Sequence, residues 1–200
     1  NRWSNLKKSW FYFTSVYQLN MKKIFHLNLK LLTILLFTIM STKTVKANKS
    51  NFITLKTSKG SIVIKTLPKV APNHVKRIKE LVSTGFYNGI IFHRVIEGFM
   101  AQTGDPLGNG TGGSGKNLKA EFSDYKYKYG TVGMARSMNP DSGDSQFFIC
   151  FDGCGHLTGQ YTVWGQVETG MEVVEKIEIG EPPSNPDQII EAFVGKKKTK

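Results

Sequence analysis

Cysteine is scarce in this sequence of 200 residues, which contains only Cys150 and Cys154. Two cysteines are too few to hold a small fold together with disulfides. Their C-x3-C spacing, with no second pair, also argues against a structural zinc site. The simplest interpretation is a pair of separate thiols. A disulfide stays open for a protein in an oxidising compartment, because the sequence does not give the geometry that the bond requires.

Acidic residues are absent from residues 1–47, which hold eight Lys or Arg side chains. The whole chain carries a net charge of +12, yet residues 48–200 hold 19 basic and all 15 acidic side chains, a net charge of +4. Four of those basic side chains lie among residues 196–200. A nucleic-acid-binding protein carries its positive charge on the folded part, so we expect no nucleic acid among the partners.

Long hydrophobic runs are also missing. The most apolar segment, residues 31–40, is ten residues long and shorter than the roughly 20 residues that cross a bilayer. With Lys22 and Lys23 before it and Val45-Lys46-Ala47 after it, this segment predicts a signal peptide over residues 21–47, cleaved after Ala47. We therefore expect a periplasmic or secreted protein with no stable membrane insertion after cleavage. The alternative is an uncleaved signal that tethers the protein to a membrane. Residues 1–20 precede Met21 and are interpreted as an upstream extension that is not part of the native product.

Glycine is frequent, with 20 residues, and this favours a turn-rich β architecture over a helical bundle. Residues 51–57 and 61–66 are rich in β-branched side chains and predict a hairpin. Residues 104–115 hold six glycines and are predicted to form a loop. Further strands are predicted at residues 90–96, 131–135, 146–151, 161–167 and 187–194.

Two segments have helical periodicity. Residues 72–84 begin with Pro72, which suits a first turn, and are followed by Gly85, which suits a helix end. Residues 170–179 predict a second helix. The two helices stand far apart among many short strands, without a βαβ rhythm. We therefore expect a mainly β fold, a closed antiparallel β-barrel capped by two α-helices.

The segment from Phe92 to Asp105 reads FHRVIEGFMAQTGD. It resembles the cyclophilin signature, in which FHR is followed by GFM and Q-x-GD. The match continues through residues 109–113, 134–135 and 145–149, and the resemblance covers residues 51–194. It implies a cyclophilin-like, eight-stranded isomerase domain over residues 48–200 and a peptidyl-prolyl cis–trans isomerase of the bacterial, exported kind.

Prolyl isomerisation places unusual demands on an active site. The X–Pro bond has nearly balanced cis and trans forms, separated by a barrier of about 18–20 kcal/mol that arises from amide resonance. Lowering this barrier requires no nucleophile, metal, cofactor or acid–base pair. It requires a group that favours a pyramidal prolyl nitrogen, a donor for the rotating carbonyl and an apolar slot for the ring.

Arg94 and Gln102 are the predicted catalytic residues. A guanidinium stays charged and offers fixed donors that can draw the nitrogen lone pair out of resonance, and the Gln102 amide can donate to the substrate carbonyl. The resemblance implies a further set of residues that bind the substrate: Phe99, Met100, Gly110, Ala135, Arg136, Ser137, Gln146, Phe148, His156, Leu157 and Tyr161. By contrast, Phe92 and Phe147 are predicted to belong to the core.

Two predicted site residues depart from the family pattern. Many cyclophilins have Trp at the position of His156, and because that Trp helps to hold the drug cyclosporin, weak cyclosporin binding is expected. Tyr161 replaces a familiar His of the proline pocket but still offers an aromatic wall and a hydroxyl. His93 has no partner for acid–base chemistry in the sequence and is interpreted as a structural, hydrogen-bonding histidine.

The main alternative to an enzyme is a chaperone or scaffold that holds Pro-containing peptides without turnover. An intact Arg94 favours the enzyme, because a pure binder needs only the pocket. A hydrolase is disfavoured, because Ser145 and His156 lack a nucleophile elbow or an ordered triad. In either main case the expected partners are unfolded or loop polypeptides that contain proline, and the protein is expected to be a monomer.

Overall fold

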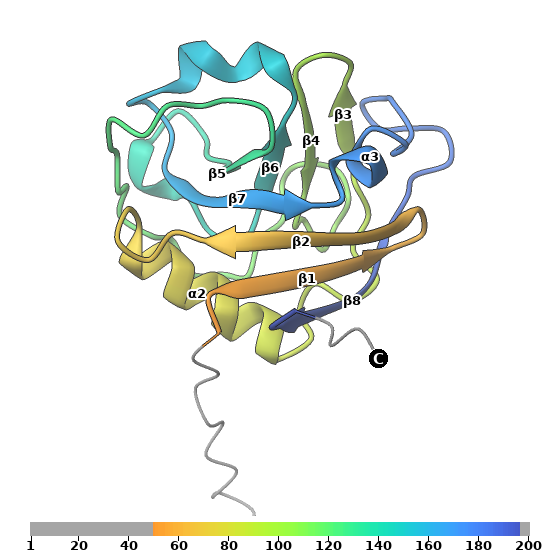
Figure 1. The fold of residues 1–200 in the computed structure, drawn as a ribbon, viewed down its shortest axis with the longest axis horizontal. Helices are drawn as coiled ribbons and strands as arrows, with labels where there is room; N and C mark the ends of the chain where they lie inside the picture. The colour runs from red at the N-terminus through yellow and green to blue at the C-terminus, as the bar shows by residue number, and fades with distance from the viewer. Residues whose placement is uncertain (1–49, 197–200) are drawn as a thin grey trace, which may run out of the picture. The chain divides into compact units, whose positions relative to one another are not determined.

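The fold is taken from a computed structural model that describes residues 50–196 (Figure 1). The predicted extension at residues 1–20, the predicted signal peptide at 21–47 and the lysines at 197, 198 and 200 lie outside the described residues. The described chain forms one antiparallel sheet of eight strands with few helices. The expectation of a mainly β fold is confirmed.

The predicted hairpin is present. It consists of β1 (Phe52–Thr57) and β2 (Gly60–Thr66), which pair in antiparallel register from Phe52↔Lys65 to Thr57↔Gly60. In β2 the buried side chains alternate with exposed or half-buried ones, as expected for a strand with one face on the core. β8 (Ile189–Val194) returns to pair with β1, so the two ends of the described chain lie on adjacent strands.

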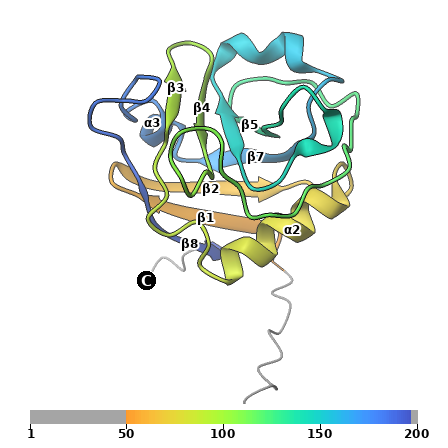
Figure 2. The ribbon, with the colours of Figure 1, turned by 180° about the vertical axis from the view of Figure 1, so that it is seen from behind.

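The remaining strands extend this sheet. They are β3 (Arg94–Ile96), β4 (Met100–Thr103), β5 (Thr131–Met134), β6 (Phe147–Cys150) and β7 (Val163–Thr169), and the order across the sheet is β3-β4-β6-β5-β7-β2-β1-β8. Figures 1 and 2 show β1, β2 and β8 running across the lower part of the molecule, while β4 and β6 stand steeply above them, so the sheet curves strongly along its strand order. The strand pairs among residues 50–196 include no ladder between β3 and β8, so the pairing order describes a curved, partly open barrel.

Residues 90–96 were predicted as one strand, but only Arg94–Ile96 form one. The N–H of Phe92 donates to the carbonyl of Asp187, and the N–H of Ile189 donates to the carbonyl of Ile90, at 2.8 Å in both cases. These bonds and an isolated bridge between Ile91 and Gln188 hold residues 90–92 near the start of β8 without forming a ladder. Conversely, β4 forms within the signature motif at residues where the sequence analysis predicts no strand.

The first helix, α2 (Pro72–Ser83), agrees closely with the prediction and has Pro72 in its first turn. Its apolar face is buried and packs against β7 and β8 (Figure 1). The second helix, α3 (Met171–Val174), is a single turn and much shorter than the predicted residues 170–179. After Val174 the N–H groups of Lys176 and Ile177 donate to carbonyls only three residues back, at Val173 and Val174. The N–H of Glu178 then donates to the Asp187 carboxylate at 2.9 Å, so the α-helical hydrogen-bond pattern does not continue. Two 3₁₀ turns, η1 (Pro140–Ser142) and η2 (Asp152–Leu157), complete the described elements.

Two apolar clusters fill the interior. The larger one lies between the sheet and α2 and includes Trp164, Phe92 and Phe147, which are at most 1% exposed, so the core prediction for these two phenylalanines is confirmed. The smaller cluster joins β4 and β6 to η2 and contains both cysteines. Its members are Met100, Tyr127, Phe148, Cys150, Cys154, Leu157 and Val163. This second cluster forms the floor of the site described below.

The Glu121 carboxylate attaches the long loop before β5 to the start of α2. It accepts hydrogen bonds from the backbone N–H groups of Asn73 (3.1 Å) and His74 (3.0 Å) and from the buried His74 ring at Nδ1 (2.7 Å). Burial by itself would raise the pKa of Glu121, but these donors, with the His74 side chain foremost, lower the pKa below its usual value. A carboxylate with free helix N–H groups as partners stabilises a helix start.

Replacing Glu121 with glutamine is expected to lower the free energy of unfolding by about 1 kcal/mol near neutral pH, as for a lost helix cap. Because the pKa of Glu121 is depressed in the folded state, its contribution is fully present above the unfolded value near 4.5 and is lost as the pH falls through the lower folded pKa. Thermal unfolding between pH 7 and pH 2 should show the two proteins converging in acid. Glu97→Gln, at an exposed carboxylate without a partner in the described chain, is the control. A constant difference at all pH values would contradict this assignment.

Candidate active site

The β3–β4 hairpin places Arg94 directly opposite Gln102 in the antiparallel register. Side chains opposite each other on paired strands project from the same face of the sheet. The two strands are joined by a tight turn in which Gly98 has a φ of 68°, a conformation that side-chain-bearing residues rarely adopt. The two predicted catalytic residues are therefore held together by a hydrogen-bonded ladder rather than by flexible loops.

A cavity of about 280 Å³ opens beside this pair. Its floor and walls are apolar and aromatic, with Met100 and Phe148 almost fully buried and Phe99 half-buried at the rim. Ten predicted site residues line it: Arg94, Phe99, Met100, Gln102, Ala135, Arg136, Phe148, His156, Leu157 and Tyr161. The cavity thus combines an apolar floor with a guanidinium and an amide at its edge, and it is of a size that suits a small ring.

A second hollow of about 390 Å³ adjoins the first and shares Gln102, Ala135 and Arg136 with it. The three remaining predicted residues, Gly110, Ser137 and Gln146, line this second hollow. All thirteen predicted site residues therefore lie around two neighbouring hollows. Sequence reasoning missed the others that line the second one, namely Thr111, Gly112, Gly113, Gly115, Asn117, Ser142 and Asp144.

The Gln146 side chain links Gln102, one of the two predicted catalytic residues, to the glycine-rich loop. Its Oε1 accepts a hydrogen bond from Gln102 Nε2 at 2.9 Å, and its own Nε2 donates to the carbonyls of Gly110 (3.0 Å) and Gly112 (2.8 Å). Because an amide nitrogen has two hydrogens, Gln102 keeps one donor for another acceptor. Gln146 uses both of its donors within the protein, so its side chain orients Gln102 and the loop.

Two carboxylates hold the glycine-rich loop in place. Asp105 accepts from the N–H groups of Leu107 (2.8 Å), Asn109 (3.0 Å) and Gly110 (2.6 Å). Burial would raise the pKa of Asp105, but these backbone donors outweigh it and lower the pKa. Asp144 accepts from the Ser114 hydroxyl and from the N–H of Gly115 at 2.8 Å. The loop is consequently a formed wall of the second hollow.

Arg136 contributes to the pocket through packing. Its guanidinium lies 4.3 Å from the centre of the Tyr161 ring, and its Nη2 donates to the carbonyl of Gln160 at 3.1 Å. The Tyr161 ring in turn meets the Phe148 ring edge to face. These contacts hold the Tyr161 ring in place as one aromatic wall of the cavity.

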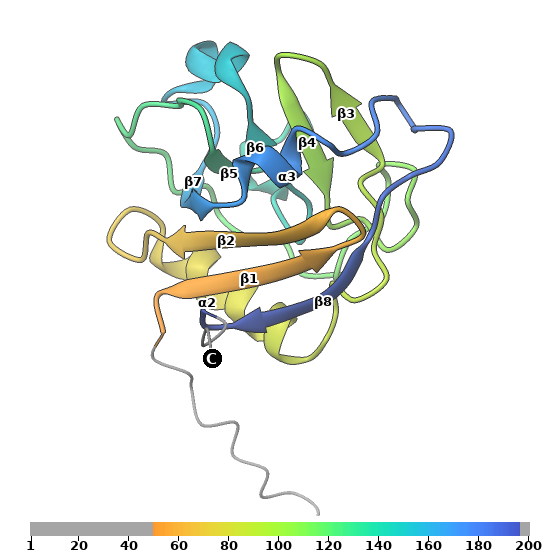
Figure 3. The same ribbon diagram turned by 45° about the vertical axis from the view of Figure 1, so that its right-hand side comes forward.

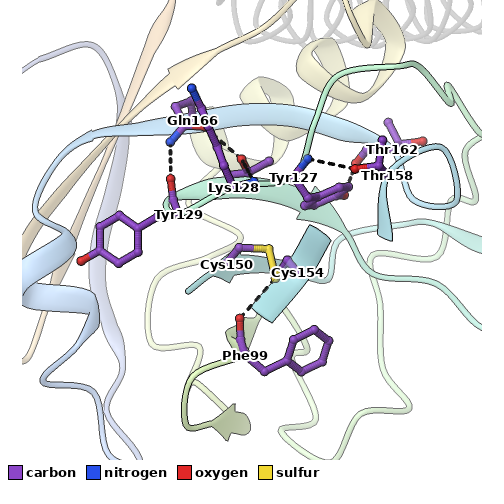
Figure 4. The surroundings of a disulfide bond; sticks show 10 residues. Phe99, Tyr127, Lys128, Tyr129, Cys150, Cys154, Thr158, Thr162 and Gln166 are labelled. Atoms are coloured by element: carbon purple, nitrogen blue, oxygen red, sulfur yellow. Dashed lines mark hydrogen bonds between the residues drawn. A yellow bond between two sulfur atoms is a disulfide. The ribbon is translucent and has the colours of Figure 1, made fainter. Parts of the chain in front are cut away.

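Cys150 and Cys154 form a disulfide, so the interpretation as two separate thiols is wrong (Figure 4). The bond joins the end of β6 to η2, and neither cysteine is exposed. Cys154 Sγ lies 3.2 Å from the carbonyl oxygen of Phe99 (Figure 4). Because η2 also carries His156 and Leu157, the disulfide fixes one wall of the cavity to its floor.

His156 and His93 differ in their surroundings. The exposed His156 ring stacks on Phe99 at a centroid distance of 5.6 Å. Weak cyclosporin binding, expected because His156 replaces a Trp, stays a prediction that an inhibition measurement would test. His93 is 5% exposed, and neither ring nitrogen has a hydrogen-bond partner of acceptable geometry among residues 50–196. Burial lowers the pKa of its ring, against an opposing interaction with the Gln146 side chain. The interpretation of His93 as a structural, hydrogen-bonding histidine therefore stays a prediction.

Within the described part of the chain, no group of three or more His, Cys, Asp or Glu side chains is arranged to hold a metal ion. Among the helices of residues 50–196, none has the length and apolar character needed to cross a membrane.

Comparison with known families decides the identity of this site. The family model described as "Cyclophilin type peptidyl-prolyl cis-trans isomerase/CLD" matches residues 52–194. The chain belongs to the cyclophilin family. This cyclophilin is 49% identical over 165 residues to a probable peptidyl-prolyl cis-trans isomerase of Brucella abortus, which covers 74% of the present chain and 84% of the relative. It is 44% identical over 137 residues to a peptidyl-prolyl cis-trans isomerase of Helicobacter pylori, covering 66% and 83% of the two chains. Its activity is accordingly peptidyl-prolyl cis–trans isomerisation.

Solved cyclophilin structures have the same fold. Cyclophilin AquaCyp293 of Hirschia baltica superposes with a TM-score of 0.66 at 30% identity, over 72% of this cyclophilin and 74% of that chain. A cyclophilin-type isomerase of Cryptosporidium parvum, solved in the presence of the dipeptide Ala-Pro, gives a TM-score of 0.68 at 27% identity, over 73% and 99% of the two chains.

Proposed function

We propose that this cyclophilin accelerates rotation about X–Pro bonds by weakening amide resonance with Arg94 while the proline ring occupies the apolar cavity. The supporting observation is the placement of one guanidinium at the edge of a cavity whose other walls are Phe99, Met100, Phe148 and Leu157. A charged donor directed at the prolyl nitrogen stabilises its pyramidal form, which exists only near the transition state. The Ala-Pro dipeptide of the Cryptosporidium parvum structure supports a Pro-containing peptide as the ligand.

In this mechanism Gln102 is the second catalytic group. Its remaining amide hydrogen donates to the substrate carbonyl, while Gln146 holds the amide in orientation. The backbone near Ala135 and Gly110 faces the substrate chain at the boundary of the two hollows. Residues that precede the proline would then lie along the second hollow.

A protease-coupled assay on a proline tetrapeptide tests this proposal against a Pro-peptide-binding chaperone or scaffold. The enzyme raises the rate of the slow phase in proportion to its concentration. A pure binder lowers the concentration of free peptide and leaves the rate constant of the remaining free peptide unchanged. Catalysis that survives substitution of Arg94 would contradict the proposed mechanism.

We further propose that the protein is exported and acts on unfolded or loop segments of other exported proteins, where uncatalysed isomerisation takes tens of seconds. The disulfide supports this proposal, because such bonds persist in oxidising compartments. Mass spectrometry of the protein after expression in its host is expected to find a chain that begins at Asn48. Retention of residues 21–47 in a membrane fraction would support the tethered form instead.

We also propose a monomer whose sheet closes into a full barrel. Closure is supported by the bridges Ile91↔Gln188 and Val95↔Gly180, which join β3 and the residues before it to the segment that leads into β8. Analytical ultracentrifugation tests the monomer, and amide exchange at Phe92 and Val95 tests closure, since both amides donate to that segment.

A further inference from the structure

The Arg94 guanidinium has a partner outside the cavity. Its Nε lies 3.3 Å from Oε2 of Glu181, which belongs to the segment between α3 and β8. In Figures 1 and 3 this segment, drawn in blue, runs beside β3. The two side chains are 39% and 49% exposed, so the pair is at the surface, and of the two only Arg94 lines the cavity.

The backbone fixes the position of Glu181 relative to Arg94. Val95, the neighbour of Arg94, exchanges two hydrogen bonds with Gly180, the neighbour of Glu181, with N···O distances of 2.8 and 3.0 Å. Gly180 has a φ of 153°, and a Cβ at this position would lie 2.6 Å from the Cα of Pro183. Glu181 itself is followed by Pro182, whose ring restricts the chain. The carboxylate is therefore held near Arg94 by a specific register.

Pairing through Nε leaves the other end of the guanidinium available. Neither Nη1 nor Nη2 of Arg94 has a hydrogen-bond partner within residues 50–196, and Arg94 lines the cavity. A guanidinium is a planar fork, so a carboxylate attracted to its Nε edge favours rotamers in which Nη1 and Nη2 face away from that carboxylate. We propose that Glu181 is a positioning residue that directs the free end of the Arg94 guanidinium into the cavity.

This inference rests on the proposed catalytic role of Arg94. An exposed arginine side chain populates many rotamers, and each that points away from the cavity reduces the fraction of competent enzyme. Because Arg94 acts on the pyramidal nitrogen of the transition state, loss of its orientation lowers kcat more than it raises KM. A residue that merely stabilised the fold would change the unfolding temperature instead.

The test measures kcat and KM separately for Glu181→Gln by exchange spectroscopy on a proline peptide. We expect kcat to fall about two- to fivefold, the range that a half-exposed ion pair supports, with KM and the unfolding temperature nearly unchanged. Glu181→Asp, which keeps the charge, should recover part of the loss. Glu178→Gln, three residues earlier on the same segment and also exposed, is the matched control and should behave as the wild type. An unchanged kcat in Glu181→Gln would overturn the inference.

A double-mutant cycle separates this inference from the proposed mechanism. In an Arg94→Ala background, Glu181→Gln should have no further effect on kcat. An equal loss in both backgrounds would show that Glu181 acts without Arg94 and would overturn the inference. If Arg94→Ala alone left the rate unchanged, the proposed mechanism itself would fail.

An NMR measurement tests the Arg94–Glu181 pair directly. The ¹⁵Nε–¹Hε resonance of Arg94 should shift and exchange faster with water in Glu181→Gln but not in Glu178→Gln.

Discussion

Replacing Arg94 with alanine is expected to reduce kcat/KM about a hundredfold while the protein stays folded. Removal of one preorganised donor from a transition state typically lowers the rate by about 10²–10³-fold. The change should be confined to catalysis, because Arg94 is 39% exposed and its ion pair with Glu181 lies at the surface. Such pairs contribute little to stability. Protease-coupled kinetics and thermal unfolding measure the two quantities.

Two further variants make this result specific. Arg94→Lys keeps the charge but loses the planar fork, so we expect a rate between those of the wild type and Arg94→Ala. Lys176→Ala removes an exposed positive charge just after α3 and serves as the control for net charge. A rate in Arg94→Ala close to that of the wild type would show that catalysis does not depend on Arg94 and would contradict the proposed mechanism.

Removing the disulfide is expected to have the largest effect on stability. The bond closes a loop with a sequence separation of 4, and the chain-entropy model assigns about 2 kcal/mol to a loop of this size. For a domain of this length, that corresponds to a fall of roughly 4–8 °C in Tm. The variant is Cys150→Ala combined with Cys154→Ala, because two alanines leave neither a free thiol nor a buried hydroxyl. Calorimetry gives the change in Tm.

The same variant should bind proline peptides more weakly. η2 carries His156 and Leu157 into the cavity wall, and the disulfide is its covalent link to β6. We expect KM to rise, with a smaller change in kcat, because Arg94 and Gln102 lie on the separate β3–β4 ladder. Wild-type protein unfolded and refolded with a dithiol reductant should match the variant. If Tm is the same with and without reductant, the disulfide does not contribute to stability.

The hairpin, the first helix and the residues that line the two hollows could be predicted from the sequence. Their signals are local: alternating β-branched residues in β2, an apolar face with Pro72 at the start of α2, and a motif whose members lie on two paired strands and the loops beside them. All thirteen predicted site residues line the two hollows. Within the motif, the spacing between Arg94 and Gln102 is the one that makes them direct neighbours when β3 and β4 pair.

The features that the sequence did not reveal depend on contacts between distant segments. The pairing of Cys150 with Cys154 depends on how η2 turns after β6, which the spacing does not determine. The path of the chain after α3 depends on a bond from the N–H of Glu178 to the Asp187 carboxylate. Glu181 lies far from the recognised motifs, and only the bridge between Val95 and Gly180 brings it to Arg94. Asp144 directly precedes the Ser145–Ile149 match, and its acidic character could have drawn attention to the second hollow.

The ladder between β3 and β4 has a consequence for how cyclophilins of this kind diversify. In the proposed mechanism, catalysis relies on two side chains, Arg94 and Gln102, which main-chain pairing holds opposite each other. The neighbouring hollow is bounded instead by a loop that the carboxylates of Asp105 and Asp144 hold in place. Mutations in that loop could redirect the enzyme towards different sequences upstream of proline while the turnover machinery is inherited unchanged. Divergent orthologues should then share one catalytic rate constant on a minimal dipeptide and differ on longer substrates.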